Sequence, residues 1–137
     1  MNVEIKLTVW PINVARALPA GLAGRAGAHA EFTGVVRGEE EGRPIAALEY
    51  EVYSPMAEKV MREIVEDLGR RLPCLFVRVT HRVGIVPVGE AAIHILATAS
   101  HRGPALAMVA EFIDRLKQDV PIWKRRALTA GELEKLK

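Results

Sequence analysis

The chain contains 137 residues, half of them hydrophobic and 26% charged, which is the balance of one globular domain rather than of a disordered segment. The net charge of +2 is too small to indicate a nucleic-acid partner. No apolar run approaches the length of a membrane span, and the N-terminus lacks the apolar region of a signal peptide. A single cysteine, Cys74, excludes an intrachain disulfide, so we expect a cytoplasmic protein whose thiol is buried and structural rather than nucleophilic.

Alternating apolar and polar residues predict a series of strands. We expect strands at residues 3–10, 29–38, 45–53, 74–84 and 91–100, with a charged turn at 38–44 and a short strand or turn at 85–90. The segment 13–28 is rich in Ala and Gly, and it is predicted to form a short irregular helix and a loop.

Two other segments carry apolar residues at helical spacing. The first has Ser54 as its N-cap and Pro55 in its first turn, and it ends near Gly69. The second begins around Pro104 and must end at Pro121, because proline lacks the backbone donor and clashes with the preceding turn. Together with the strands, these helices predict one α+β domain over the whole chain, with helices packed on a mixed or antiparallel sheet.

Two histidines fall inside predicted strands. His81 is in phase with Leu75, Val77 and Val79, so we expect its ring to face the core and to be hydrogen-bonded. His94 alternates with isoleucines and is predicted to face outwards or towards a partner. No pair of His, Cys or acidic residues has metal-ligand spacing, and there is no Gly-rich phosphate loop or nucleophile elbow. We therefore expect no metal site.

In the segment VPIWKRR, residues 120–126, a proline, an isoleucine and a tryptophan directly precede three consecutive cations. Lys117 lies on the last turn of the preceding helix, and the turn that Pro121 forces would fold Lys124 back towards it. We expect Trp123 and the preceding isoleucine to pack and to fix this corner. The alternative is that these lysines are solvated cations at a helix end, where the macrodipole favours positive charge.

Two further groups of cations adjoin the ends of predicted elements. Ser-His-Arg at residues 100–102 follows a strand and precedes the second helix, whose free backbone N–H groups favour anions. Arg37 stands at the end of the strand 29–38, after three uncharged residues. With Lys117 and Lys124, these positions predict a local basic site for a small anion rather than a broad basic face.

Five motifs occur in the order and spacing of one known family. They are FTGVVRGEEEG (32–42), LEYEVYSPMAEK (48–59), HRVGIVPVGE (81–90), SHRGPAL (100–106) and LKQDVPIWKRR (116–126). With these motifs the chain resembles the large, catalytic subunits of molybdopterin synthases, over roughly residues 30–126. The preceding residues match only in outline.

The resemblance implies an α/β-hammerhead-type fold with a small extra β subdomain. It also implies a sulfurtransferase of molybdenum cofactor biosynthesis, which converts cyclic pyranopterin monophosphate to molybdopterin without a cofactor of its own. The sulfur would come from the thiocarboxylate on the C-terminal Gly-Gly tail of a small ubiquitin-like carrier subunit. The implied assembly is a heterotetramer, a homodimer of large subunits with one carrier at each end, and it has no nucleic-acid or membrane partner.

The family's site residues transfer to this chain position by position. Lys117 and Lys124 match the two lysines central to activity, and the role of Lys117 as nucleophile, base or electrostatic group stays open. The His-Arg pair is implied to act across the dimer interface. Phe32 and Met108 match positions near the pocket wall, where we expect core packing rather than substrate contact. The implied substrate-binding residues are Arg37, His101, Arg102, Arg125 and Arg126.

Three departures from the family pattern bear on activity. Arg126 replaces an acid, Glu39-Glu40-Glu41 occupies a turn that usually contains Asn, and the tail 127–137 is short and lacks a closing Trp. Disorder of this tail and an unusual partner contact both stay open. One alternative function is therefore a catalytically weak homologue that binds or regulates a carrier protein. The other is an unrelated anion- or RNA-binding module, which the weak net charge disfavours.

Overall fold

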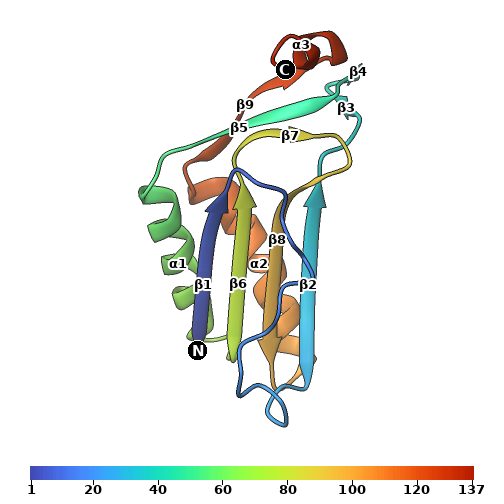
Figure 1. Ribbon diagram of the computed structural model, residues 1–137. Helices are drawn as coiled ribbons and strands as arrows, with labels where there is room; N and C mark the ends of the chain where they lie inside the picture. Colours follow the sequence, from blue (N-terminus) through green and yellow to red (C-terminus); the bar gives the residue numbers. More distant parts are fainter.

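The computed structural model describes residues 1–137 and is built around a four-stranded mixed sheet (Figure 1). Its strands, in the order β1-β6-β8-β2, are β1 (Asn2–Thr8), β6 (Phe76–Arg82), β8 (Ala91–Ala99) and β2 (Ala28–Val35). β1 and β6 run parallel, whereas the other two pairings are antiparallel. Helices α1 (Met56–Gly69) and α2 (Arg102–Asp119) cover one face of this sheet, which confirms the predicted α+β class.

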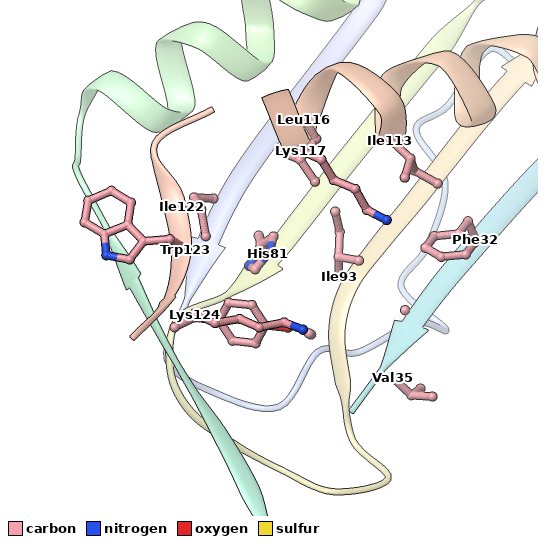
Figure 2. A pocket seen from close by; sticks show the side chains of 13 residues that line it. Phe32, Val35, His81, Ile93, Ile113, Leu116, Lys117, Ile122, Trp123 and Lys124 are labelled. Carbon is pink, nitrogen blue, oxygen red and sulfur yellow. The ribbon is translucent and has the colours of Figure 1, made fainter. Parts of the chain in front are cut away.

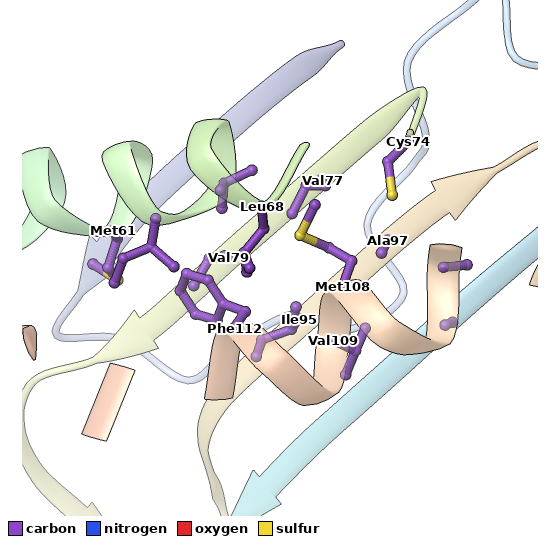
Figure 3. Close-up of a cluster of buried hydrophobic side chains, with 14 of the residues drawn as sticks. Met61, Leu68, Cys74, Val77, Val79, Ile95, Ala97, Met108, Val109 and Phe112 are labelled. Carbon is purple, nitrogen blue, oxygen red and sulfur yellow. The ribbon is translucent and has the colours of Figure 1, made fainter. Parts of the chain in front are cut away.

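The main core lies between the two helices and the sheet (Figure 3). Every second residue of β6 and β8 points towards the helices, because side chains alternate along a strand. The buried members of this cluster include Val77, Val79, Ile95, Ala97, Met61, Met108 and Phe112. Cys74 lies in the same cluster, and its burial raises the pKa of the thiol, which fits the predicted structural role.

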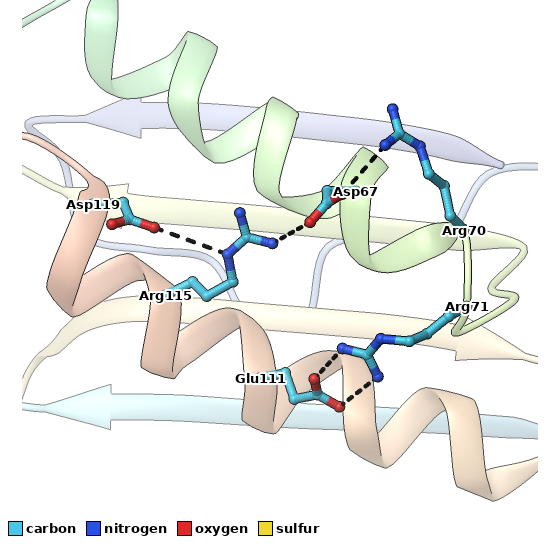
Figure 4. Close-up of polar contacts among 6 residues, drawn as sticks. All are labelled: Asp67, Arg70, Arg71, Glu111, Arg115 and Asp119. Atoms are coloured by element: carbon cyan, nitrogen blue, oxygen red, sulfur yellow. Dashed lines mark hydrogen bonds and ion pairs between the residues drawn. The ribbon is translucent and has the colours of Figure 1, made fainter.

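Ion pairs join the exposed sides of α1 and α2 (Figure 4). Asp67 of α1 accepts from Arg115 of α2 at 2.5 Å, and Arg71 forms a bidentate pair with Glu111 of α2. These guanidinium donors hold the pKa values of both carboxyl groups below their ordinary range. Because the pairs are exposed to solvent, they add little stability, and the apolar core remains the main force that holds the helices on the sheet.

The segment between β1 and β2 crosses the other face of the sheet as turns and irregular chain (Figure 1). The predicted short helix within 13–28 was therefore wrong. Gly21 and Gly24 adopt φ values of 88° and 82°, which lie outside the helical region. Leu22 instead packs on Phe76 and covers part of the sheet.

Polar side chains on this second face pair with one another. His94 points away from the helices, but it is only 3% exposed and its Nε2 lies 2.9 Å from Glu31 Oε1. The prediction that it faces outwards was wrong, because neighbouring side chains cover it. Arg78 is buried in the same layer, where it donates to Glu4 and to the carbonyl oxygen of Ala17, each at 2.8 Å.

A second, three-stranded antiparallel sheet lies beyond one end of the first (Figure 1). Its strands, in spatial order, are β7 (Gly84–Pro87), β5 (Ala47–Val52) and β9 (Ile122–Leu128). A small separate core joins Leu48 and Val86 of this sheet to Val36 and Ala92 at the end of the first. The chain therefore has the predicted small β subdomain.

Two short elements flank the second sheet. A hairpin of β3 (Glu39–Glu40) and β4 (Arg43–Pro44) forms the predicted charged turn. Helix α3 (Ala130–Glu134) follows β9 and begins with a capping box, in which Thr129 and Glu132 each accept a backbone N–H of the other. None of the three helices combines the length and apolarity that a membrane crossing requires.

The structure confirms the predicted end of α2 but not the predicted N-cap of α1. Helix α2 ends at Asp119, just before Pro121, as predicted. Ser54 is not the N-cap of α1, because its hydroxyl donates to the Glu58 carboxylate at 2.8 Å and accepts no backbone N–H.

Strand β9 was not predicted, since four exposed residues, 123–126, interrupt any apolar alternation there.

Candidate active site

A pocket of about 370 Å³ opens where the end of α2 meets both sheets (Figure 2). Thirteen residues from α2, β2, β5, β6, β8 and β9 line it, and nine of them are hydrophobic. Its titratable side chains are Tyr50, His81, Lys117 and Lys124. The pocket is therefore an apolar cavity with a few polar groups, which is the usual composition of a small-molecule site.

Lys117 enters the pocket from the last turn of α2. Ile113 precedes it by four positions and lies on the same helix face, so both side chains reach the cavity. Leu116 packs against the main core and fixes the rotation of this turn. Figure 2 shows the ammonium group extended over the cavity towards Ile93. Lys117 has no ion-pair partner within the chain, so its charge is available to a ligand.

Lys124 enters from β9, on the other side of the cavity (Figure 2). It pairs with Tyr50 of β5 in the antiparallel ladder, and it lies on the same side of its strand as Ile122. Its Nζ donates to Glu40 Oε1 of the β3–β4 hairpin at 3.2 Å. Two ammonium groups from different elements thus face one cavity, as the sequence predicted.

The corner between α2 and β9 is not fixed by Trp123, because this residue is 47% exposed and its side chain points away from Lys124 (Figure 2). The sequence interpretation was therefore wrong for Trp123, whereas Ile122 packs against the main core as predicted. Val120, which is buried in the main core, anchors the chain after the helix. The N–H of Tyr53 donates to the carbonyl of Pro121 at 3.0 Å and starts the β5–β9 pairing. Strand alternation then aims Lys124 into the pocket.

His81, which is buried, and Tyr50, which is half-buried, form the floor of the cavity. Their rings meet edge to face, with centroids 5.2 Å apart and planes at 74°. His81 Nδ1 lies 2.7 Å from the carbonyl oxygen of Arg82, which confirms the predicted core-side, hydrogen-bonded ring. Burial lowers the pKa of His81, although the hydrogen bond to Arg82 opposes this shift. Burial, and then the negative charge of Glu40, raise the pKa of Tyr50.

The predicted anion-binding residues outside the lysine pair do not line this pocket. Arg37 is exposed and lies two residues beyond Val35, which is a wall residue. His101 is the N-cap of α2 and Arg102 is its first residue, whereas Lys117 is in its last turn. With a rise of about 1.5 Å per residue, the two ends are roughly 22 Å apart along the helix axis. One chain alone does not bring the His-Arg pair to the lysines.

The last two predicted cations lie on β9 beside Lys124. Arg125 is exposed and has no ion-pair partner within the chain. Arg126 donates from Nε to Glu49 Oε1 of β5 at 2.6 Å, so a neighbouring acid offsets the charge at this position. Of the two predicted wall positions, Phe32 lines the cavity and is 39% exposed, whereas Met108 is wholly buried in the core.

Sequence reasoning missed Glu40 and Tyr50 as parts of the site. Tyr50 lies within the strand predicted at 45–53, and nothing in its immediate sequence distinguishes a pocket floor from a core. Glu40 and Lys124 are 84 positions apart in the chain. Only the packing of the hairpin beside β9 brings them together, and no local pattern reports such a contact.

The model of the MoaE protein family matches residues 7–119 of this chain. The chain belongs to the MoaE family. A curated human relative, named molybdopterin synthase catalytic subunit, is 44% identical over 99 residues, which are 72% of this chain and 53% of that protein. An Aspergillus niger relative of the same name is 37% identical over 134 residues, 98% of this chain and 74% of its own length. This MoaE chain therefore spans about half the length of the human relative.

Solved structures give the same family. A molybdopterin synthase structure from Staphylococcus aureus has a TM-score of 0.79 and 32% identity, and the match covers 86% of each chain. A MoaE protein from Burkholderia ambifaria has a TM-score of 0.75 and 28% identity, over 98% of this chain and 97% of that one. Nearly the full length of this MoaE chain, including the second sheet, therefore has counterparts among known MoaE structures.

Proposed function

We propose that this chain is the catalytic subunit of a molybdopterin synthase, a sulfurtransferase that acts in molybdenum cofactor biosynthesis. Membership of the MoaE family and the names of the curated relatives support this function. The observation that carries it is that Lys117 and Lys124 enter one pocket from two separate elements. The substrate is cyclic pyranopterin monophosphate, and the sulfur donor is the thiocarboxylate tail of a small carrier subunit.

The charge and polarity of the pocket suit these two reactants. Both are anions, one through its cyclic phosphate and the other through its thiocarboxylate, and the cavity offers two ammonium groups. Nine apolar lining residues lower the local dielectric, so each charge interaction is stronger than it would be in water. The flat pterin ring would lie against apolar walls such as Ile93 and Phe32.

The two lysines would act as electrostatic groups in the transfer. The thiocarboxylate sulfur forms a carbon–sulfur bond to a side-chain carbon of the pterin while a carbon–oxygen bond at that carbon breaks, and the departing oxygen takes the electron pair. Pterin and carrier are then joined as a thioester. Water then attacks the acyl carbon, and the sulfur remains on the pterin. Negative charge develops on oxygen and sulfur during these steps, and ammonium groups fixed beside a cavity stabilise it without reorganisation. A second transfer completes the dithiolene.

The remaining predicted binding residues require an assembly. His101 and Arg102 lie at the far end of α2, so we propose that a second copy of this chain supplies them to the pocket. Arg37 and Arg125 are exposed near the pocket and would bind the substrate phosphate. Residues 1–137 would act as one domain within a heterotetramer of two such subunits and two carriers. We place the reaction in the cytoplasm, where a lone buried thiol such as Cys74 stays reduced.

The alternative of a catalytically weak homologue depended on Arg126 and on the short tail. The Glu49 carboxylate at 2.6 Å offsets the charge of Arg126, and both lysines face the pocket. We therefore favour an active enzyme.

Replacement of each pocket lysine tests the proposal. We expect Lys117→Ala and Lys124→Ala each to lower the rate of molybdopterin formation by at least 100-fold, as loss of a group that stabilises developing charge does. The assay mixes the purified chain with a thiocarboxylated carrier and the cyclic pterin, and it measures the pterin product by chromatography. Circular dichroism would show an unchanged fold, since both lysines are exposed.

Lys59→Ala is the matched control, because Lys59 is an exposed lysine on α1, outside the pocket. It removes the same charge and should leave the rate unchanged. Normal turnover by both pocket variants would overturn the assignment of the site, and absence of turnover by the unmodified chain would favour the alternative of a carrier-binding homologue.

A further inference from the structure

The tautomer of His81 follows from its hydrogen bond. Nδ1 lies 2.7 Å from the backbone oxygen of Arg82, and a carbonyl oxygen can only accept. Nδ1 therefore carries a proton and donates it. In a neutral imidazole the second nitrogen, Nε2, then has no proton and presents a lone pair.

This lone pair opens to the pocket. His81 Nε2 has no hydrogen-bond partner within the chain. Among the side-chain nitrogen and oxygen atoms that are fully buried, only Arg82 Nε lacks a partner, so His81 Nε2 is not one of the fully buried atoms. Nε2 therefore keeps accessible surface, although His81 as a whole is only 5% exposed. Because His81 lines the pocket, a molecule in the cavity can contact this nitrogen.

No other titratable side chain that lines the pocket is suited to accept a proton. Lys117 and Lys124 face the cavity as ammonium groups, which have donors and no acceptor. Burial and the charge of Glu40 raise the pKa of Tyr50, so its phenol stays protonated. Burial lowers the pKa of His81 and outweighs the opposing hydrogen bond to Arg82, so the neutral form is favoured.

We propose that His81 Nε2 is the proton acceptor of this pocket and activates the water that releases the carrier. This inference rests on the proposed sulfur transfer. The thiocarboxylate is already an anion and needs no base for its attack, whereas water does. As the water oxygen bonds to the acyl carbon, its proton passes to Nε2. The carbon–sulfur bond to the acyl carbon then breaks, and its electron pair stays on the sulfur of the pterin. The imidazolium afterwards returns the proton to solvent.

His81→Asn tests this role with the least change of structure. The Asn amide can still donate to the Arg82 carbonyl from the place of Nδ1, but it has no basic nitrogen at the place of Nε2. We expect kcat to fall about 100-fold or more, as loss of a general base does, while the KM for the carrier changes little. In a rapid-quench experiment the pterin–carrier thioester should accumulate, and added imidazole should restore part of the rate.

The pH profile gives a second readout that a structural role would not produce. Neutral His81 is the active form, and its pKa lies below the ordinary histidine value of 6.5. The unmodified chain should therefore lose activity only below pH 6.5, as the imidazole becomes protonated. This acidic limb should disappear in His81→Asn. His29→Asn is the matched control, because His29 is an exposed histidine on the opposite face, bonded to Thr98.

The outcomes separate this inference from the proposed function. If the unmodified chain transfers sulfur and folded His81→Asn does so at the same rate with the same pH profile, His81 is not the base and the function stands. If the unmodified chain transfers no sulfur, the proposed function fails first. A ¹⁵N spectrum keeps the test open even if the variant does not fold: a proton on Nε2 at neutral pH would overturn the inference.

Discussion

The ion pair between Glu40 and Lys124 makes a testable prediction about how the pocket receives an anion. Glu40 Oε1 accepts from Lys124 Nζ at 3.2 Å, and the two side chains are 27% and 48% exposed. An incoming carboxylate or thiocarboxylate that binds Lys124 must compete with this internal acid. Glu40→Gln removes the negative charge and keeps the size of the side chain, so it should strengthen the binding of an anionic tail.

The expected magnitude follows from the exposure of the pair. A partly exposed ion pair contributes about 0.5–1 kcal/mol after solvent screening. If that interaction is lost on ligand binding, its removal tightens binding by the same amount, which is about two- to fivefold in Kd. Glu40 also helps to raise the pKa of Tyr50, so the variant should lower the pKa of this phenol part of the way towards its ordinary value of 10.0.

Isothermal titration calorimetry with a synthetic peptide that ends in Gly-Gly would measure the affinity, and ultraviolet titration would follow the tyrosines. Glu39→Gln is the control, because Glu39 is the adjacent exposed acid of the same hairpin and has no ion pair. Each variant removes one negative charge and so raises the net charge of the molecule by one. An equal decrease in the Kd of the peptide for both variants would mean that the net charge alone explains the effect. An unchanged Kd in Glu40→Gln would refute the proposed competition between Glu40 and the peptide carboxylate.

Three further predictions concern the second sheet and the pocket floor. Arg126→Glu should lower stability by about 0.5–1 kcal/mol because it faces Glu49, and adding Glu49→Arg should restore it in urea unfolding. Val120→Ala should cost about 1–2 kcal/mol of buried apolar contact and lower the sulfur-transfer rate through a displaced Lys124, whereas Trp123→Ala should change both much less. Because His81 has a lowered pKa in the folded chain, the unfolded chain binds more protons below pH 6.5. The free energy of unfolding should therefore be at its full value above pH 6.5 and fall by up to about 1.4 kcal/mol for each pH unit below it. His81→Asn should reduce this loss.

The sequence predicted those parts of the structure that depend on local patterns. The apolar alternation of residues 91–100 and the helical spacing before Pro121 produced correct elements, and Pro121 ended α2 as its chemistry requires. The convergence of Lys117 and Lys124 was also predicted, since it depends on a helix end and a turn only a few residues long.

Long-range pairing explains what the sequence did not predict. Strand β9 forms because it pairs with β5, more than seventy residues earlier in the chain, and four exposed side chains hide its strand character. The contacts of Glu40 with Lys124 and of Glu49 with Arg126 have the same origin. Ser54 misled in another way, because a nearby acid, Glu58, took the hydroxyl that a cap would have used.

The position of the pocket explains why its two lysines come from different parts of the fold. Lys117 is held by α2, which the main core fixes on the first sheet, whereas Lys124 is held by the pairing of β9 with β5 in the second sheet. Only Val120 and Pro121 connect α2 to β9, so a short, buried junction sets the distance between the two ammonium groups. A geometry fixed by packing rather than by a mobile loop keeps both charges directed at the cavity before any ligand arrives, which is what electrostatic stabilisation of a transition state requires.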